Sequence, residues 1–231
     1  MNIFNHIKLI NIIKILLYIP LAGTAFAFPS LLSFGICLIV FILLLVDLFL
    51  IHKAEVRYSN LYRSAYYDSL TNIPNRLSAD IFVSECSSPD NISVIIADLD
   101  GLKFANDTFG HHTGDILIKD FAALFADSAC PEGFAARNGG DEFLAVFPED
   151  GDGSHAIRFC GRLKQAVYTH NISAEHPISY SIGYACSHDD SHFSIQRLIS
   201  IADNRMYEQK RKKKQASSKE SICIQSVSEK Y

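Results

Sequence analysis

One long apolar run constrains this chain more than any other feature of its sequence. Residues 31 to 51, "LLSFGICLIVFILLLVDLFLI", contain a single formal charge, Asp47. At a rise of 1.5 Å per residue, a helix of this length spans roughly 31 Å, about the thickness of the hydrocarbon core of a bilayer. The run therefore predicts a transmembrane helix, with Asp47 close enough to one end for the interface to solvate it.

A second apolar stretch, residues 9 to 28, precedes this run and has two interpretations. It is long enough to span a bilayer if Lys14 reaches toward the headgroups, and the turn "FPS" at 28–30 would then join two spans. It also resembles a signal peptide, with basic residues, an apolar core and "AFA" at 25–27 as a cleavage site. We favour the first interpretation, in which residues 1–51 form an uncleaved transmembrane hairpin.

Basic residues follow the second predicted span, whereas the turn at 28–30 has none. They are His52, Lys53, Arg57 and Arg63. By the positive-inside rule this asymmetry places residue 52 onward in the cytoplasm. Residues 52–67 lack glycine and proline, so they predict a linker helix that continues out of the membrane and would pair two chains.

The rest of the chain has the composition of a soluble globular domain. The formal net charge of −4 gives no support for a nucleic-acid binder, which normally has a basic balance. None of the six cysteines forms a C-x-x-C pair, so we interpret them as free thiols in a reducing compartment.

Strand and helix patterns alternate irregularly from residue 68 to residue 214. The strands are expected at 92–100, in both arms of a hairpin over 133–147, and at 177–186; the helices are expected at 77–86, 116–128, 153–170 and 194–214. A polar loop is expected at 101–115 and a disordered tail at 215–231. This order predicts an α/β sandwich with a central, mostly antiparallel sheet.

The hairpin carries the motif "RNGGDEF" at residues 137–143. We expect its two glycines to accept positive φ in a two-residue turn. Because side chains alternate across a strand, Asp141 and Glu142 should point to opposite faces, and only one of them can share a site with Asp98. Facing carboxylates repel each other unless a cation lies between them, and oxygen ligands suit Mg²⁺.

The segment after Asp98 has the residue types of a nucleotide site. Backbone amides that lead into a helix amino terminus can bind phosphates, and Lys103 adds a positive charge there. Asn106 and Asp115 have the donors and acceptors needed to read a guanine edge. Acids on adjacent strands are typical of metal-assisted phosphoryl transfer.

Five segments in this order resemble the GGDEF-domain diguanylate cyclases, over residues 68 to about 212. They are "DSLTNIPNR", "ADLDGLKFANDTFGHHTGD", "RNGGDEF", "SIG" at 181–183 and "ADNRMYEQK" at 202–210. The chain departs from the family pattern at three places. Asn72 stands where glycine is common, the end of the last helix lacks a usual glycine-arginine pair, and "CPEG" at 130–133 replaces an R-x-x-D motif that grips the product in many relatives.

The resemblance implies a polymerase-palm, nucleotidyl-cyclase-like fold preceded by the two transmembrane helices. It implies that a homodimer, formed through the cyclase domain and the membrane and linker helices, condenses two GTP molecules to cyclic di-GMP and releases pyrophosphate. The implied location is the bacterial inner membrane, with no nucleic-acid partner. The alternative is a catalytically silent GTP-binding regulatory module, but this chain keeps every acid of the site.

The resemblance also implies a role for individual residues, with Mg²⁺ as cofactor and Mn²⁺ as a second candidate. The implied metal ligands are Asp98, the Leu99 carbonyl and Glu142; Asp141 assists activation of the attacking 3′-hydroxyl; Asn106, His111 and Asp115 hold guanine; Lys103, Lys210 and Lys214 meet the phosphates. Because the glycine-arginine pair is missing, the contact implied for Lys214 is the weakest of these.

Overall fold

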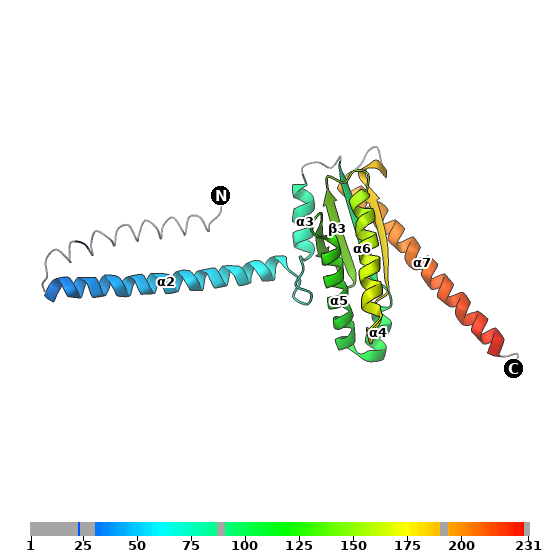
Figure 1. The fold of residues 1–231 in the computed structure, drawn as a ribbon, viewed down its shortest axis with the longest axis horizontal. Helices are drawn as coiled ribbons and strands as arrows, with labels where there is room; N and C mark the ends of the chain where they lie inside the picture. The colour runs from blue at the N-terminus through cyan, green and yellow to red at the C-terminus, as the bar shows by residue number, and fades with distance from the viewer. Residues whose placement is uncertain (1–22, 24–30, 87–90, 190–193, 229–231) are drawn as a thin grey trace. The chain divides into compact units, whose positions relative to one another are not determined.

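The structure, a computed structural model, describes residue 23 and residues 31–86, 91–189 and 194–228. The chain divides into two compact units, Met1–Leu61 and Tyr62–Tyr231. The first predicted span, residues 9 to 28, lies outside the described residues except for Gly23. Figure 1 shows the elements of both units.

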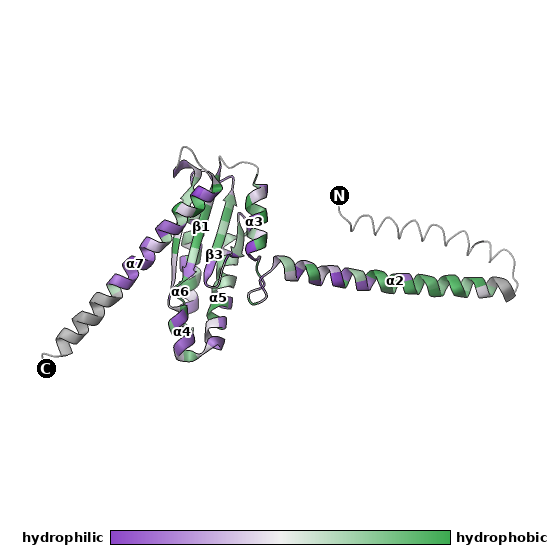
Figure 2. Cartoon of the chain, turned by 180° about the vertical axis from the view of Figure 1, so that it is seen from behind, coloured by the Kyte–Doolittle hydropathy of each residue, from purple (hydrophilic) through white to green (hydrophobic). Residues whose placement is uncertain are grey.

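Helix α2 (Leu31–Tyr66) contains the long apolar run and continues through the predicted linker helix. Apolar side chains such as Leu38, Phe41 and Leu48 are exposed on it, and its first part is the hydrophobic part in Figure 2. Among the described residues, one helix is apolar and long enough to cross a bilayer, at Phe34–Tyr66. Length and composition alone give this result, and a signal sequence passes the same test.

The second unit contains one four-stranded sheet with the strand order β2-β3-β1-β4. The strands are β1 (Ile92–Leu99), β2 (Phe134–Arg137), β3 (Glu142–Pro148) and β4 (Tyr180–Cys186). Every pair of neighbours is antiparallel, which confirms the predicted sheet.

Helices cover both faces of this sheet, as Figure 1 shows. They are α3 (Arg76–Glu85), α4 (Leu102–Phe109), α5 (His111–Ala129), α6 (Ser154–Asn171) and α7 (Ile195–Ser228), with a short 3₁₀ turn at Ser187–Asp189. Two separate cores result, one toward α5 and α6 and the other toward α3 and α7. Strand β1 serves both cores, because Ile95 and Ala97 face the first and Val94 and Ile96 the second. This double burial explains the unbroken apolar run in its sequence.

One expectation about local structure was wrong. The segment 101–115, expected to be a polar loop, forms α4 and the first turn of α5, separated only at Gly110, where φ is 87°. This polar sequence is compatible with a helix because the helix satisfies its own backbone hydrogen bonds. Helix α7 extends to Ser228, and the disorder expected for the tail from residue 215 stays a prediction.

The hairpin also differs from the expected primed turn. Strands β2 and β3 are separated by residues 138–141, and neither Gly139 nor Gly140 has φ in the left-handed region. A Cβ on Gly140 would meet nothing within 4 Å, whereas one on Gly139 would lie 3.2 Å from a carboxylate oxygen of Glu142. The glycines therefore keep the backbone of the tip accessible rather than supply positive φ. Asn72 does have positive φ, 58°, in the position where related sequences often have glycine.

Candidate active site

The register of the sheet brings the two predicted metal-binding acids together. Asp98 on β1 is directly opposite Glu142 on β3, and directly paired residues share one face of a sheet. This is also the face of Ile96, which α7 covers. Asp98 is 7% exposed, whereas Glu142 is exposed to solvent. The pair therefore has one anchored carboxylate and one that reaches an open cleft.

A lysine from the last helix contacts the buried acid. Lys210 donates a hydrogen bond from Nζ to Oδ1 of Asp98. Burial, together with the charges of Asp141 and Asp100, raises the pKa of Asp98 despite the lowering effect of this ammonium group. Burial acts to lower the pKa of Lys210, but the bond and charge of Asp98 outweigh it and raise that pKa overall. A positive charge thus occupies the side of Asp98 where a cation would bind.

Asp141 precedes β3, so the strand alternation does not apply to it. Its carbonyl oxygen accepts a hydrogen bond from the Leu99 amide at 3.0 Å, which joins the hairpin tip to the end of β1. Its charge acts on both Asp98 and Lys210. The expectation that only one of the two adjacent acids shares a site with Asp98 stays a prediction. Glu142 is the register partner, and Asp141 contributes to the local field.

A cleft lies between these acids and α7. It is lined by Asp98 and Glu142 on the sheet side and by Lys210, Arg211 and Lys214 on the helix side. Among the described residues no three histidine, cysteine or acidic side chains are grouped to hold a metal. Two carboxylates and a backbone carbonyl still fit Mg²⁺, which commonly takes its other ligands from water and substrate phosphates. The ammonium group on Asp98 shows that this carboxylate accepts a cation.

The residues predicted to read guanine lie where α4 and α5 meet. Asn106 packs directly against Gly114, where a Cβ would lie 1.9 Å from the Asn106 Oδ1 atom. This oxygen is buried and, within the described part of the chain, has no hydrogen-bond partner. Asp115 follows Gly114 and is half-buried, so an acceptor and a carboxylate lie close together. The close approach of Asn106 to α5 requires glycine at residue 114.

The remaining predicted residues are on the same helices but are less constrained. Lys103, in the first turn of α4, and His111, the first residue of α5, are both exposed. Among the residues described, neither has a hydrogen bond that would fix its side chain. The structure therefore puts their helices beside the Asn106–Asp115 pair without fixing what these two side chains bind.

Comparison with known families decides the assignment. The model of the family described as diguanylate cyclase, GGDEF domain, matches residues 65–216, which includes every predicted site residue. The chain belongs to the GGDEF family. The palm-like α/β fold that the resemblance implied is confirmed.

Relatives of this GGDEF domain include named cyclases. Diguanylate cyclase DosC of Escherichia coli K12 is 32% identical over 152 residues, which is 63% of this chain and 33% of that protein. The signaling protein YkoW of Bacillus subtilis 168 is 35% identical over 172 residues, 71% of this chain and 21% of that protein. The match thus spans about a third or less of these relatives.

Solved structures agree with this fold. The coiled coil and GGDEF domain of DgcB from Caulobacter crescentus, in complex with c-di-GMP, has a TM-score of 0.58 and 25% identity over 73% of this chain and 92% of that one. A sensory box/GGDEF family protein from Caulobacter crescentus CB15 has a TM-score of 0.53 and 30% identity over 64% of this chain and 99% of that one.

Arg137 of the GGDEF motif has a defined role that the sequence alone did not reveal. Its Nε and Nη2 atoms donate to the carbonyls of Gly139 and Gly140, at distances of 2.7 to 3.2 Å. Its Nη1 atom forms an ion pair with Asp68 at 2.8 Å. Asp68 also accepts from both the amide and the hydroxyl of Thr71. Arg137 therefore ties the glycine tip to the turn that begins the domain.

The "SIG" motif is explained by the packing of α7 on β4. A Cβ on Gly183 would lie 2.1 Å from the Ala202 carbonyl oxygen and 2.4 Å from the Met206 nitrogen. The two backbones can approach this closely only at glycine. The Ile182 amide donates to Oε1 of Gln209 at 2.6 Å. This motif therefore sets where α7 lies, and hence where Lys210 meets Asp98.

The segment that replaces the product-binding motif of many relatives does not resemble a ligand site. Cys130 is exposed, and Glu132 pairs with Arg162 at 3.0 Å. A Cβ on Gly133 would lie 2.3 Å from the Phe147 ring, so an aspartate there would have to displace this buried side chain.

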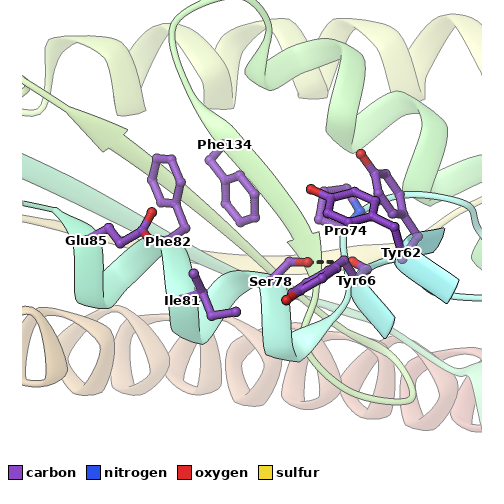
Figure 3. Close-up of a pocket in the computed structure, with 9 residues that line it drawn as sticks. Tyr62, Tyr66, Pro74, Ser78, Ile81, Phe82, Glu85 and Phe134 are labelled. Carbon is purple, nitrogen blue, oxygen red and sulfur yellow. Dashed lines mark hydrogen bonds between the residues drawn. The ribbon is translucent and has the colours of Figure 1, made fainter. Parts of the chain in front are cut away.

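A separate aromatic pocket lies at the start of the GGDEF domain (Figure 3). Tyr62 and Tyr66 line one end of it, and Phe82 and Phe134 stack at the other with ring centroids 4.3 Å apart. Ser78 donates to the Tyr66 carbonyl across the pocket, as Figure 3 shows. None of the acids of the cleft lines it.

Proposed function

We propose that this chain is a diguanylate cyclase that condenses two GTP molecules to cyclic di-GMP with release of two pyrophosphates. The observation that carries the proposal is the direct pairing of Asp98 with Glu142 beside the Lys210 ammonium group. A carboxylate pair of this kind serves metal-assisted attack of a ribose 3′-hydroxyl on an α-phosphate. The relatives named as diguanylate cyclases support the same reaction.

Each part of the cleft has a distinct task in this reaction. Asp98, the Leu99 carbonyl and Glu142 would hold Mg²⁺, which stabilises charge on the phosphates when bound. Lys210 and Lys214 bind the triphosphate, because both line the cleft with the acids. Asp141 orients the attacking 3′-hydroxyl and accepts its proton. Asn106 and Asp115 accept hydrogen bonds from guanine, and the buried Asn106 oxygen gains a partner in doing so.

The reaction requires two copies of the domain. One domain offers one cleft, whereas the product joins two nucleotides symmetrically, so two clefts must meet face to face. The rate per chain should therefore rise with protein concentration until the dimer saturates. A constant specific activity from a chain that light scattering shows to be monomeric would contradict this part of the proposal.

We also propose that the chain is anchored in the bacterial inner membrane with the GGDEF domain in the cytoplasm. The apolar part of α2 and the basic residues after it support this arrangement. An anchor confines the chains to two dimensions and raises the local concentration of partners. Recovery of the protein in the soluble fraction of a lysate, without detergent, would argue against the anchor.

The acids provide the direct test of the proposed chemistry. Asp98→Asn and Glu142→Gln each remove one charge and keep the shape of the side chain. We expect each to lower cyclase turnover about a thousandfold or more, because electrostatic stabilisation of phosphoryl transfer is large. Near-wild-type turnover in a variant that circular dichroism shows to be folded would refute the metal assignment. GTP binding without product in the wild type would favour the silent regulatory module.

A further inference from the structure

A second contact between lysine and aspartate lies about one turn further along α7. The Asp100 carboxylate, just after β1, accepts from the Ser179 hydroxyl at 2.9 Å and from the Ser181 hydroxyl at 2.7 Å. Lys213 donates to the same carboxylate at 2.9 Å. It also donates to the Tyr180 carbonyl, and its ammonium group lies 5.6 Å from the centroid of the Tyr180 ring.

The lysines in this part of α7 line two different cavities. Lys210 and Lys214 line the cleft that contains Asp98 and Glu142. Lys213 does not line this cleft; it lines a neighbouring cavity with Ser179 and Tyr180. Lys213 and Lys214 are adjacent in sequence and diverge by about 100° around the helix, one on each side of Lys210, which allows this division. Lys213 is thus directed at the sheet rather than at the proposed substrate.

Asp100 is held by groups from more than one element. Its carboxylate accepts from Lys213 on α7, from Ser181 on β4 and from Ser179 just before β4. The Asp100 amide donates to the Ser179 carbonyl at 2.9 Å. The contact therefore joins the end of β1, β4 and α7 at one point.

This contact matters because of what happens to Lys210 in the proposed reaction. The carboxylate that Lys210 contacts in the structure is the one that would bind Mg²⁺. If Asp98 held Mg²⁺, Lys210 would contact a phosphate in its place, and this part of α7 would have one link fewer to the sheet. Among the described residues, the links that do not involve a metal-binding acid include the Gln209–Ile182 hydrogen bond and the contacts of Lys213 with Asp100 and the Tyr180 carbonyl.

We propose that Lys213 and Asp100, with Ser179 and Ser181, form a positioning clamp that fixes α7 so that Lys210 and Lys214 face the triphosphate of GTP. The proposal rests on the proposed cyclase function. Lys213 is a positioning residue and touches no substrate.

Three variants of the whole chain, purified in detergent, test the clamp. Lys213→Met removes the charge and keeps the length of the side chain, and Lys213→Arg restores a cation. Lys212→Met is the matched control, because it makes the same charge change in the same turn outside the contact with Asp100. The measurements are KM and kcat for GTP with Mg²⁺, and the affinity for a non-hydrolysable GTP analogue with Mg²⁺.

We expect Lys213→Met to raise KM and weaken analogue binding about tenfold, with kcat within about twofold of wild type, because charged hydrogen bonds to the phosphates are misplaced. Lys213→Arg should return KM to within about threefold of wild type, and Lys212→Met should leave it unchanged. A half-exposed ion pair contributes little to folding stability, so the variants should remain folded.

Two results would overturn the clamp. One is a Lys213→Met protein with wild-type KM and analogue affinity. The other is an equal loss in Lys212→Met, since this would show a general effect of positive charge rather than a specific contact. A wild-type chain that makes no cyclic di-GMP would refute the proposed function instead. The analogue affinities would then still compare Lys213→Met with Lys212→Met and test the clamp separately.

Discussion

Replacement of Gly183 by alanine should both destabilise the domain and slow the reaction. The added Cβ would lie 2.1 Å from the Ala202 carbonyl oxygen and 2.4 Å from the Met206 nitrogen. Both atoms belong to the backbone of α7 and cannot rotate away. Restoring an ordinary contact of 3.4 Å to the first atom needs a shift of about 1.3 Å (3.4 − 2.1). Helix α7 must therefore move away from β4 by about 1 Å.

The cost follows from this displacement. Overpacking of a core typically costs about 1–3 kcal/mol, and for a domain of this size each kcal/mol lowers Tm by about 2–4 °C. Lys210 would move with the helix, and a misplacement of about 1 Å at a reacting site can lower the rate about a hundredfold. We expect a Tm lower by about 2–12 °C and a cyclase rate lower by at least about tenfold.

The assay is thermal unfolding followed by circular dichroism, together with cyclic di-GMP production measured by chromatography. Gly161→Ala is the matched control, because Gly161 is in α6 and a Cβ there meets nothing within 4 Å. That variant should be unchanged or slightly more stable, since alanine is the better helix former. A Gly183→Ala protein with wild-type Tm and rate would refute the argument that β4 and α7 require glycine at their contact.

Three further predictions concern other parts of the domain. Arg137→Ala should lower the cyclase rate about tenfold or more, because the glycine tip loses the donors to its carbonyls, and Arg137→Lys should not restore it; a wild-type rate would contradict this. Added cyclic di-GMP should cause no strong non-competitive inhibition, since Cys130 and Gly133 offer no grip on it; such inhibition at low micromolar product would be contrary evidence. The hydrogen bond from Arg205 is the main reason that the pKa of Asp189 is lower in the folded protein than its ordinary value of 3.8. The ionised Asp189 therefore stabilises the fold above pH 3.8, and this stabilisation is lost as the pH falls through the pKa of the folded state. The stability difference between wild type and Asp189→Asn should thus disappear at low pH, and a difference independent of pH would contradict the ion pair.

The sheet and the metal-binding acids could be predicted because they depend on local pattern. The apolar run ending at Asp98 and the apolar run after Glu142 define two strands, and strand register then decides which acids share a face. Most of α5 and all of α6 also follow from apolar spacing. By contrast, residues 101–115 are mostly polar and have no periodic apolar pattern that would predict a helix. The helices there depend on the packing of α4 against α5.

The sequence alone could not predict the contacts between segments that are far apart in the chain. Arg137 looks like an ordinary strand residue until its distance to Asp68 is known. Asp100 follows the last residue of β1, and its partner Lys213 is more than a hundred residues away in the chain. The close approach at Gly183 also becomes visible only when α7 is placed on β4.

Identification of the product tests the central claim most directly. The whole chain in detergent is incubated with GTP and Mg²⁺, beside the Glu142→Gln protein, and the nucleotides are analysed by mass spectrometry. The proposal predicts cyclic di-GMP and pyrophosphate from the wild type and at most a trace from the variant. Unchanged GTP after prolonged incubation of a folded, dimeric wild-type protein, or equal product from both proteins, would contradict the assignment of Asp98 and Glu142 as the centre of a cyclase.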